Sequence, residues 1–407
     1  MIYEKTNINN FKLHTIKTTN FKSIKIMINF RRKLLKKEAS VNALLFLLLI
    51  YRTKNYDYKS LIEKKEDLYK LILNSNTDYE NDEYKNSSIH LKFLHPKYTY
   101  SNIELDVLKL FKEVIFNPIF DDSKTNRNIK ELLKSKIISI KEEKVIHARN
   151  LMSELLNCNY PNKYGYIDEL DNLTEKEIEN YYNDMITNDQ IDIFVVGDID
   201  SKLYIDYFKD LFKTNKRYNK KTYSKYKKIE EKEHYIEEKD INQAKLLVSL
   251  KPINFDIKDK EINRLYTSIL GGGTSSKLFK IIREKYSLAY YASIYREDLQ
   301  ISIIESGIDI KNYDKTIKLI RKCLKDMSNI TIEDLNIAKT RLINMLEKVE
   351  YNQNAIIDFY LTNELLEEDK TINERIEEIN KVTLEDVLKF NEKVHIDNIL
   401  LYGDKNE

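Results

Sequence analysis

The sequence predicts an α+β fold made of two homologous sheet-and-helix domains, and two observations support this. Short apolar runs typical of strands are interspersed with longer segments whose apolar residues recur at helical spacing. Landmarks of the first half also return in the second half, as the pairs Thr174 and Thr383, Asn128 and Asn336, and Gly197 and Gly403. Their offsets are 383 − 174 = 209, 336 − 128 = 208 and 403 − 197 = 206. Such regular spacing favours an internal duplication.

Several strands are expected in the first half. Residues 23–30 alternate Ile24, Ile26 and Ile28 with other side chains, which is the two-residue period of a strand. Further strands are expected at 68–73, 90–94 and 191–196.

The most apolar run of the chain, residues 43–51, is expected to form a buried core helix. It is too short to span a bilayer as a helix, and it begins too late for an ordinary signal peptide. The other expected helices cover 58–67, 102–116, a charged region 128–156 that is broken once, and a segment opened by a capping box at Thr174–Glu177. Asn117–Pro118 ends the second of these.

A highly charged interval separates the two halves. Residues 213–240 contain clusters of Lys and Glu and are predicted to be a solvated linker; binding of an acidic partner is the alternative. The first domain then covers 1–212 and the second 241–407, and the second opens on a strand at 244–250.

Composition bounds the function. The 407 residues carry a formal net charge of only +2, which argues against a dedicated nucleic-acid binder. No membrane segment is expected either. The two cysteines, Cys158 and Cys323, cannot build a disulfide framework and fit a reducing compartment, so the protein is expected to be cytoplasmic.

The most informative stretch is 269–291. Three of the seven glycines are consecutive here, Gly271–Gly273, and Thr274 or Ser275 can cap a following helix. Arg283 falls near the end of that helix, and a β-prone run begins at Tyr290. The glycines also allow a phosphate-binding loop, but no Gly-Lys-Ser/Thr follows them.

This stretch resembles a family motif. Leu270–Gly273, Arg283–Lys285 and Leu288–Tyr290 are similar to the second-domain motif of insulinase-like (pitrilysin-type) zinc peptidases. The whole chain most resembles a bacterial branch associated with aminopentanol modification of elongation factor P, on the runs 164–167 and 192–200. The resemblance implies two homologous domains like those of mitochondrial processing peptidase. Tyr286–Ser287 departs from the Arg-Gly of many relatives, so the turn before Tyr290 is not fixed by the resemblance.

In the family, an inverted motif on a first-domain helix holds zinc: two His ligands and a Glu base. Here the ligand positions fall at Ala43 and Leu47 and the base at Phe46, all apolar side chains that cannot coordinate zinc. The helix expected to give the third ligand, 130–136, offers Glu131 without partners. No two of the six histidines are three or four residues apart; they are His14, His90, His95, His147, His234 and His395. The chain is therefore expected to hold no metal or other cofactor, with zinc on a partner chain.

Two further family residues are present. The resemblance assigns Arg283 and Tyr290 as substrate and oxyanion contacts, because a guanidinium and a phenol both donate hydrogen bonds. It also assigns Gly271, Gly272, Gly273, Thr274 and Ser275 to substrate binding. The alternatives are structural: Arg283 can complement the dipole at a helix end, and Tyr290 can be a packed strand residue.

Together these features predict a non-catalytic subunit of a heterodimeric insulinase-like metallopeptidase. Its partners would be a homologous zinc-bearing chain and an extended peptide or unfolded protein segment, and the resemblance suggests the elongation factor P modification pathway. A non-enzymatic peptide-binding scaffold is the alternative, and an autonomous zinc peptidase is the least favoured reading.

Overall fold

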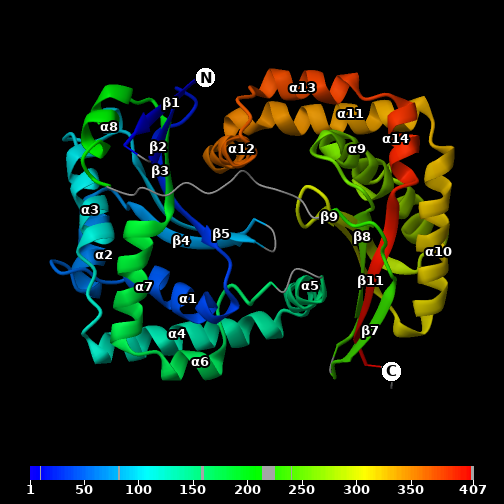
Figure 1. Cartoon of the computed structure of the whole chain (residues 1–407), viewed down its shortest axis with the longest axis horizontal. Helices are drawn as coiled ribbons and strands as arrows, with labels where there is room; N and C mark the ends of the chain where they lie inside the picture. The colour runs from blue at the N-terminus through cyan, green and yellow to red at the C-terminus, as the bar shows by residue number, and fades with distance from the viewer. Residues whose placement is uncertain (10, 81–82, 157–159, 213–224, 240, 405–407) are drawn as a thin grey trace. The chain divides into compact units, whose positions relative to one another are not determined.

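The computed structural model describes residues 1–9, 11–80, 83–156, 160–212, 225–239 and 241–404 (Figure 1). Contacts divide the chain into two compact units. Unit 1 comprises Met1–Ser139, Tyr160–Lys220 and Val349–Glu367, and unit 2 comprises Ile140–Asn159, Lys221–Lys348 and Glu368–Glu407. The domain limits expected from the sequence stay a prediction, and Cys158 and residues 213–224 and 240 lie outside the described part.

Unit 1 is built on a mixed sheet in the order β1-β2-β6-β3-β5-β4. Its strands are β1 (Ile2–Ile8), β2 (Phe11–Lys17), β3 (Ser23–Lys33), β4 (Ile72–Tyr79), β5 (Tyr84–Leu94) and β6 (Gln190–Gly197). All neighbours are antiparallel except β2 and β6, which run parallel. The strand β4 is at one edge of this sheet.

One face of the sheet of unit 1 is covered by helices. These are α1 (Ala39–Leu49), α2 (Tyr58–Asp67), α3 (Glu104–Phe116), α4 (Ser123–Glu142), α6 (Ile167–Asn172), α7 (Glu175–Asn188) and α8 (Ser201–Phe208). Ile24, Ile26 and Ile28 pack with them in one core, as their alternation predicted. Met27, which lies between Ile26 and Ile28 in the sequence, belongs instead to a second hydrophobic cluster that includes Ile356.

Unit 2 repeats this topology. Its sheet has the order β7-β11-β8-β10-β9, in which only β7 and β11 are parallel. The strands are β7 (Lys232–Glu237), β8 (Ala244–Pro252), β9 (Ala289–Arg296), β10 (Ser302–Ile308) and β11 (Val394–Gly403). The helices are α9 (Lys260–Gly271), α10 (Tyr313–Asp326), α11 (Ile332–Glu347), α13 (Ile372–Lys381) and α14 (Leu384–Asn391). Order and directions match β2-β6-β3-β5-β4, which confirms the duplicated α+β fold.

One helix of each half is assigned to the other half's unit. In unit 1, α12 (Gln353–Leu366) is held by Gln353, whose Nε2 donates to the carbonyls of Ser23 at 2.9 Å and Val196 at 3.0 Å. In unit 2, α5 (Lys144–Leu155) packs on the sheet, and Arg149 Nε donates to Glu305 Oε2 at 2.5 Å. The two helices start 353 − 144 = 209 residues apart, so this reciprocal arrangement follows the duplication.

Most expected elements are present. The helix 58–67, the break between α4 and α5, and the capping box of Thr174 with Glu177 are confirmed. Residues 43–49 of the apolar run lie in α1, where every residue except Leu47 is buried, and the helix ends before Ile50 and Tyr51. The remaining short turns are η1 (Lys36–Glu38), η2 (Pro96–Tyr98), η3 (Ile257–Asp259), η5 (Ile310–Asn312), η6 (Met327–Asn329) and η7 (Lys348–Tyr351).

Two expectations differ from the structure. The strand expected at 68–73 is wrong, because Tyr69 and Lys70 adopt φ of 58° and 60° and turn the chain after α2, so that β4 begins at Ile72. The interval predicted as a charged linker contains β7, which joins the sheet of unit 2 as an edge strand. Charged side chains are typical of such edges. Among the described helices, none is long and apolar enough to cross a membrane.

Candidate functional site

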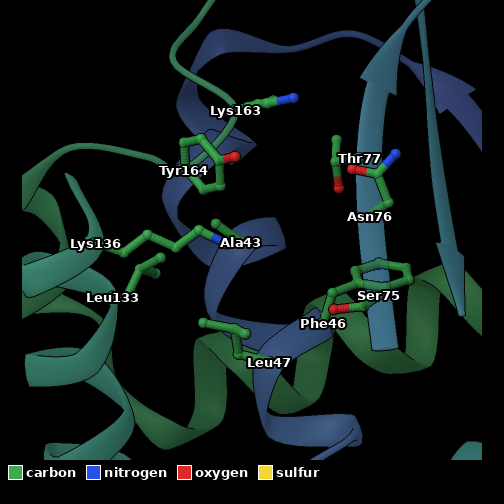
Figure 2. A pocket seen from close by; sticks show the side chains of 10 residues that line it. All are labelled: Ala43, Phe46, Leu47, Ser75, Asn76, Thr77, Leu133, Lys136, Lys163 and Tyr164. Atoms are coloured by element: carbon green, nitrogen blue, oxygen red, sulfur yellow. The ribbon is translucent and has the colours of Figure 1, made fainter. Parts of the chain in front are cut away.

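A small pocket of about 70 Å³ in unit 1 lies where the resemblance places the metal motif (Figure 2). Three elements and one loop line it. Its residues are Ala43, Phe46 and Leu47 of α1, Ser75, Asn76 and Thr77 of β4, Leu133 and Lys136 of α4, and Lys163 and Tyr164 of the loop before α6. The structure therefore brings the three aligned motif positions together, beside the helix expected to give the third ligand.

The side chains at these positions do not fit a zinc ion. Zinc in proteins is bound by thiolate, imidazole or carboxylate groups, whereas Ala43, Phe46 and Leu47 offer only methyl, phenyl and alkyl groups. Among the residues that the structure describes, no group of three or more His, Cys, Asp or Glu could hold a metal ion. We therefore derive no metal-dependent step on this chain.

Glu131 and five of the six histidines are engaged elsewhere. Glu131 is absent from the pocket lining, its side chain is 63% exposed, and it pairs with Lys134 at 2.9 Å. The described contacts of the histidines are structural: His14 with Tyr3, His90 with Ser88, His95 with the Asp198 carbonyl, His147 with the Tyr402 ring and His234 with Asn398.

A buried polar network fixes α1 beside β4. Asn42 Nδ2 donates to Thr77 Oγ1 at 3.1 Å, and Ser87 Oγ donates to Asn42 Oδ1 at 3.1 Å. Tyr181 Oη of α7 also donates to Asn42 Oδ1, at 2.9 Å. Burial raises the pKa of Tyr181 well above its ordinary value, so it remains a donor. This network holds α1 against β4 and so fixes the position of Ala43, the next residue of α1, in the pocket wall.

Gly165 seats the loop that carries Lys163 and Tyr164. It has φ +79°, a conformation that side-chain-bearing residues rarely adopt, and a Cβ there would lie 2.5 Å from Ser40 Cα. The adjacent Tyr166 N–H donates to Ser40 Oγ at 2.9 Å. Because the loop contacts the backbone of α1 directly, only glycine fits at this position.

Replacing this glycine should therefore disturb the pocket. We expect Gly165→Ala to lower the free energy of unfolding by more than about 1 kcal/mol, because positive φ and a backbone clash both oppose a Cβ. Urea unfolding followed by circular dichroism measures this. Asp168→Ala, at an exposed position of α6, is the control and should stay within about 0.5 kcal/mol of wild type. Equal stability of Gly165→Ala and wild type would contradict this packing account.

Positive charge surrounds the pocket. Lys136 Nζ lies 4.6 Å and Lys163 Nζ 5.6 Å from the centroid of the Tyr164 ring. Both distances are within the range of cation–π attraction. In Figure 2 the Lys136 side chain extends from α4 towards Ala43. Lys163 Nζ is 3.8 Å from Asp78 Oδ1, whose side chain is 66% exposed.

Arg283 lies in unit 2 on the π-helix η4 (Phe279–Lys285). Ser276 Oγ, rather than Thr274 or Ser275, accepts the Phe279 N–H at 3.4 Å, where the helical turns begin. The exposed Arg283 guanidinium lies 4.8 Å from the centroid of the Phe279 ring. Isolated π-helical turns are frequent at functional sites. Arg283 also lies in the last turn of η4, where a cation complements the helix dipole, so the structural alternative for this residue remains open.

Tyr290 is displaced outward by a β-bulge in β9, an edge strand of unit 2. Gly307 pairs with Tyr291 and Ile308 with Ala289, which leaves Tyr290 as the extra residue. Its side chain is 81% exposed. Bulges re-aim side chains and occur next to active sites, so Tyr290 is not a packed strand residue. Before it, Ser287 adopts φ 49°, so the tight turn forms without glycine.

The triple glycine packs against protein groups. A Cβ at Gly271 would lie 2.7 Å from Ile294 Cγ2, and one at Gly273 would lie 2.4 Å from the Arg341 guanidinium. Arg341 Nη2 also donates to Ser275 Oγ at 3.4 Å. Because neighbouring side chains lie so close, packing alone accounts for glycine at these positions. Substrate contact by residues 271–275 stays a prediction.

Comparison with known proteins identifies relatives. The family model "Peptidase M16 inactive domain" matches residues 172–342. The Bacillus subtilis (strain 168) protein described as "Probable inactive metalloprotease YmfF" is 26% identical over 400 residues, which cover 94% of this chain and 93% of that protein.

Two crystal structures share the fold. A conserved protein from Enterococcus faecalis V583 has a TM-score of 0.86 at 24% identity, covering 100% of this chain and 99% of that chain. A peptidase M16 inactive domain from Pseudomonas fluorescens has a TM-score of 0.80 at 16% identity, with the same coverage of both chains.

The sequence placed the aligned metal-motif positions on the helix 43–51 but did not predict a pocket there, nor that Lys136, Lys163 and Tyr164 would line it. The run 164–167 could have indicated Tyr164 as a pocket residue, but in the sequence it served only to support the family resemblance. Apolar side chains at the metal positions agree with the relatives described as inactive. By the family match over residues 172–342 and by these relatives, the chain is similar to insulinase-like peptidases that are described as inactive.

Proposed function

We propose that this non-catalytic peptidase homologue is one subunit of a heterodimeric insulinase-like metallopeptidase. A homologous chain would hold the zinc and the general base. This chain would contribute chamber wall, Arg283 and Tyr290. The proposal extends to a cytoplasmic role in elongation factor P modification, which rests on the resemblance of the sequence and on its two lone cysteines.

The observation that carries the proposal is the contrast between the two sites. The metal positions are filled by apolar groups, yet Arg283 and Tyr290 are both exposed. Among the described residues, none forms a side-chain hydrogen bond or ion pair with either of them. Polar groups held outward in this way can donate to a substrate carbonyl or an oxyanion.

An extended peptide is the substrate class that the fold favours. In unit 1, β4 is an edge strand, so the backbone groups on its outer side are available for one more strand. Main-chain pairing of this kind recognises backbone more than side chains. It suits a protein that accepts unfolded segments of varied sequence.

The test is reconstitution. This chain and a zinc-bearing homologue are mixed, and cleavage of a quenched fluorescent peptide is measured against each chain alone. We expect activity in the mixture, with kcat/KM reduced about 100-fold by Arg283→Ala, as for loss of one oxyanion donor. Lys285→Ala, an exposed cation on the same π-helix, is the matched control and should keep full activity. Unchanged activity of Arg283→Ala in a co-eluting complex would exclude the shared site.

The second candidate is a peptide-binding scaffold that needs no proteolysis. It is favoured by one observation: the pocket and the edge strand β4 both belong to unit 1. Peptide binding there would therefore need neither Arg283 nor Tyr290, which belong to unit 2. The two functions differ in their dependence on zinc. Chelating the partner's zinc should abolish the role of a peptidase subunit and leave that of a scaffold intact.

A further inference from the structure

The pocket at the lost metal position is still cationic. Lys136 and Lys163 place two ammonium groups beside the Tyr164 ring. Among the described residues, none forms an ion pair with Lys136. Asp78 is the one described carboxylate in ion-pair range of Lys163, and it is mostly exposed. Positive charge therefore exceeds negative charge around this pocket.

One side of this pocket is apolar. Ala43 and Leu47 of α1 and Leu133 of α4 form it (Figure 2). A ligand that fits here has a short hydrocarbon part and an anionic end. Since ammonium groups bind carboxylates in charge-assisted hydrogen bonds, a carboxylate on one or two methylene groups matches both surfaces.

We infer that this pocket binds the side-chain carboxylate of an Asp or Glu in an extended peptide that adds as a strand to β4. The inference rests on the proposed peptide-binding function and gives it a specificity that β-strand pairing alone does not have. The carboxylate lies between Lys136 and Lys163, and its methylene groups contact Ala43 and Leu47.

The position of the pocket along β4 selects a side chain rather than a peptide terminus. Ser75–Thr77 line the pocket, whereas the strand runs from Ile72 to Tyr79. A paired peptide therefore continues past the pocket in both directions. A chain that ended there with its terminal carboxylate would leave half of the edge strand without a partner.

The test uses three fluorescein-labelled, β-prone nonapeptides and the full-length chain. The first is blocked at both ends with a central Glu, the second replaces it with Gln, and the third has a central Gln and a free terminal carboxylate. Fluorescence anisotropy at low salt gives each Kd. We expect the Glu peptide to bind about 5- to 10-fold more tightly than the Gln peptide, as for a partly exposed charge pair.

Variants locate the effect. Lys136→Gln should remove most of the Glu preference, and Lys136→Arg should retain it. Lys124→Gln is the matched control, because Lys124 is an exposed residue in the first turns of the same helix and is absent from the pocket lining. Circular dichroism checks that each variant is folded.

The outcomes separate the two proposals. Equal affinity for the Glu and Gln peptides overturns the carboxylate pocket and leaves peptide binding standing. Preference for the free terminal carboxylate overturns the side-chain assignment. Failure of all three peptides to bind overturns peptide binding by the isolated chain, and the carboxylate pocket with it.

Discussion

Glu80→Gln is expected to lower the free energy of unfolding by about 3–5 kcal/mol, the cost of removing one charge from a buried ion pair. Glu80 accepts two hydrogen bonds from Arg31, from Nε at 2.6 Å and from Nη2 at 2.7 Å. Arg31 is 1% and Glu80 2% exposed. The Arg31 guanidinium also lies 4.2 Å from the centroid of the Tyr84 ring. Glutamine keeps the size of the side chain but removes the charge.

Two further variants test this interpretation by urea unfolding. The double variant Arg31→Met with Glu80→Leu removes both charges, so it should be much closer in stability to wild type than Glu80→Gln. Glu63→Gln breaks the exposed pair with Lys59 and should cost less than about 1 kcal/mol. A loss below 1 kcal/mol for Glu80→Gln would mean that water reaches this pair.

Acid is expected to destabilise the protein through His90. Burial, followed by the nearby charge of Lys25, lowers the pKa of His90 from 6.5 to about 4. Because its folded pKa is depressed, its contribution to stability is complete above pH 6.5 and is lost as the pH falls towards 4. The difference in pKa corresponds to about 3 kcal/mol over that window.

The measurement is the free energy of unfolding between pH 8 and pH 4 for wild type and His90→Gln. Glutamine does not titrate, so the wild type should lose about 3 kcal/mol more than the variant over this range. The two curves should run parallel above pH 7. Parallel curves down to pH 4 would show that the folded protein protonates His90 as readily as the unfolded chain does.

The fold was largely predictable because its elements are specified by local patterns. Alternation of Ile24, Ile26 and Ile28 predicted β3, and Thr174 with Glu177 predicted the start of α7. The repeat offsets predicted two equivalent sheets, which the strand orders confirm. The turn at Tyr69 was missed because non-glycine residues at positive φ have weak sequence signals.

The candidate site was predictable only in part. The apolar residues at the aligned metal positions were read directly from the sequence, since donor chemistry depends on residue type alone. The bulge that exposes Tyr290 was not, because it depends on the register between β9 and β10. Lys136 and Lys163 were missed for the same kind of reason, as they come from separate elements that meet at the Tyr164 ring.

The sequence by itself determined that this chain is a duplicated sheet-and-helix protein. It also determined that the positions aligned with the family's metal motif carry no donor atoms, because residue identity decides both periodicity and coordination chemistry. Only the tertiary structure decided which groups surround those positions. It also decided that α12 packs in unit 1 and α5 in unit 2. The physical reason is that packing joins residues far apart in the chain, and local sequence patterns carry little information about such contacts.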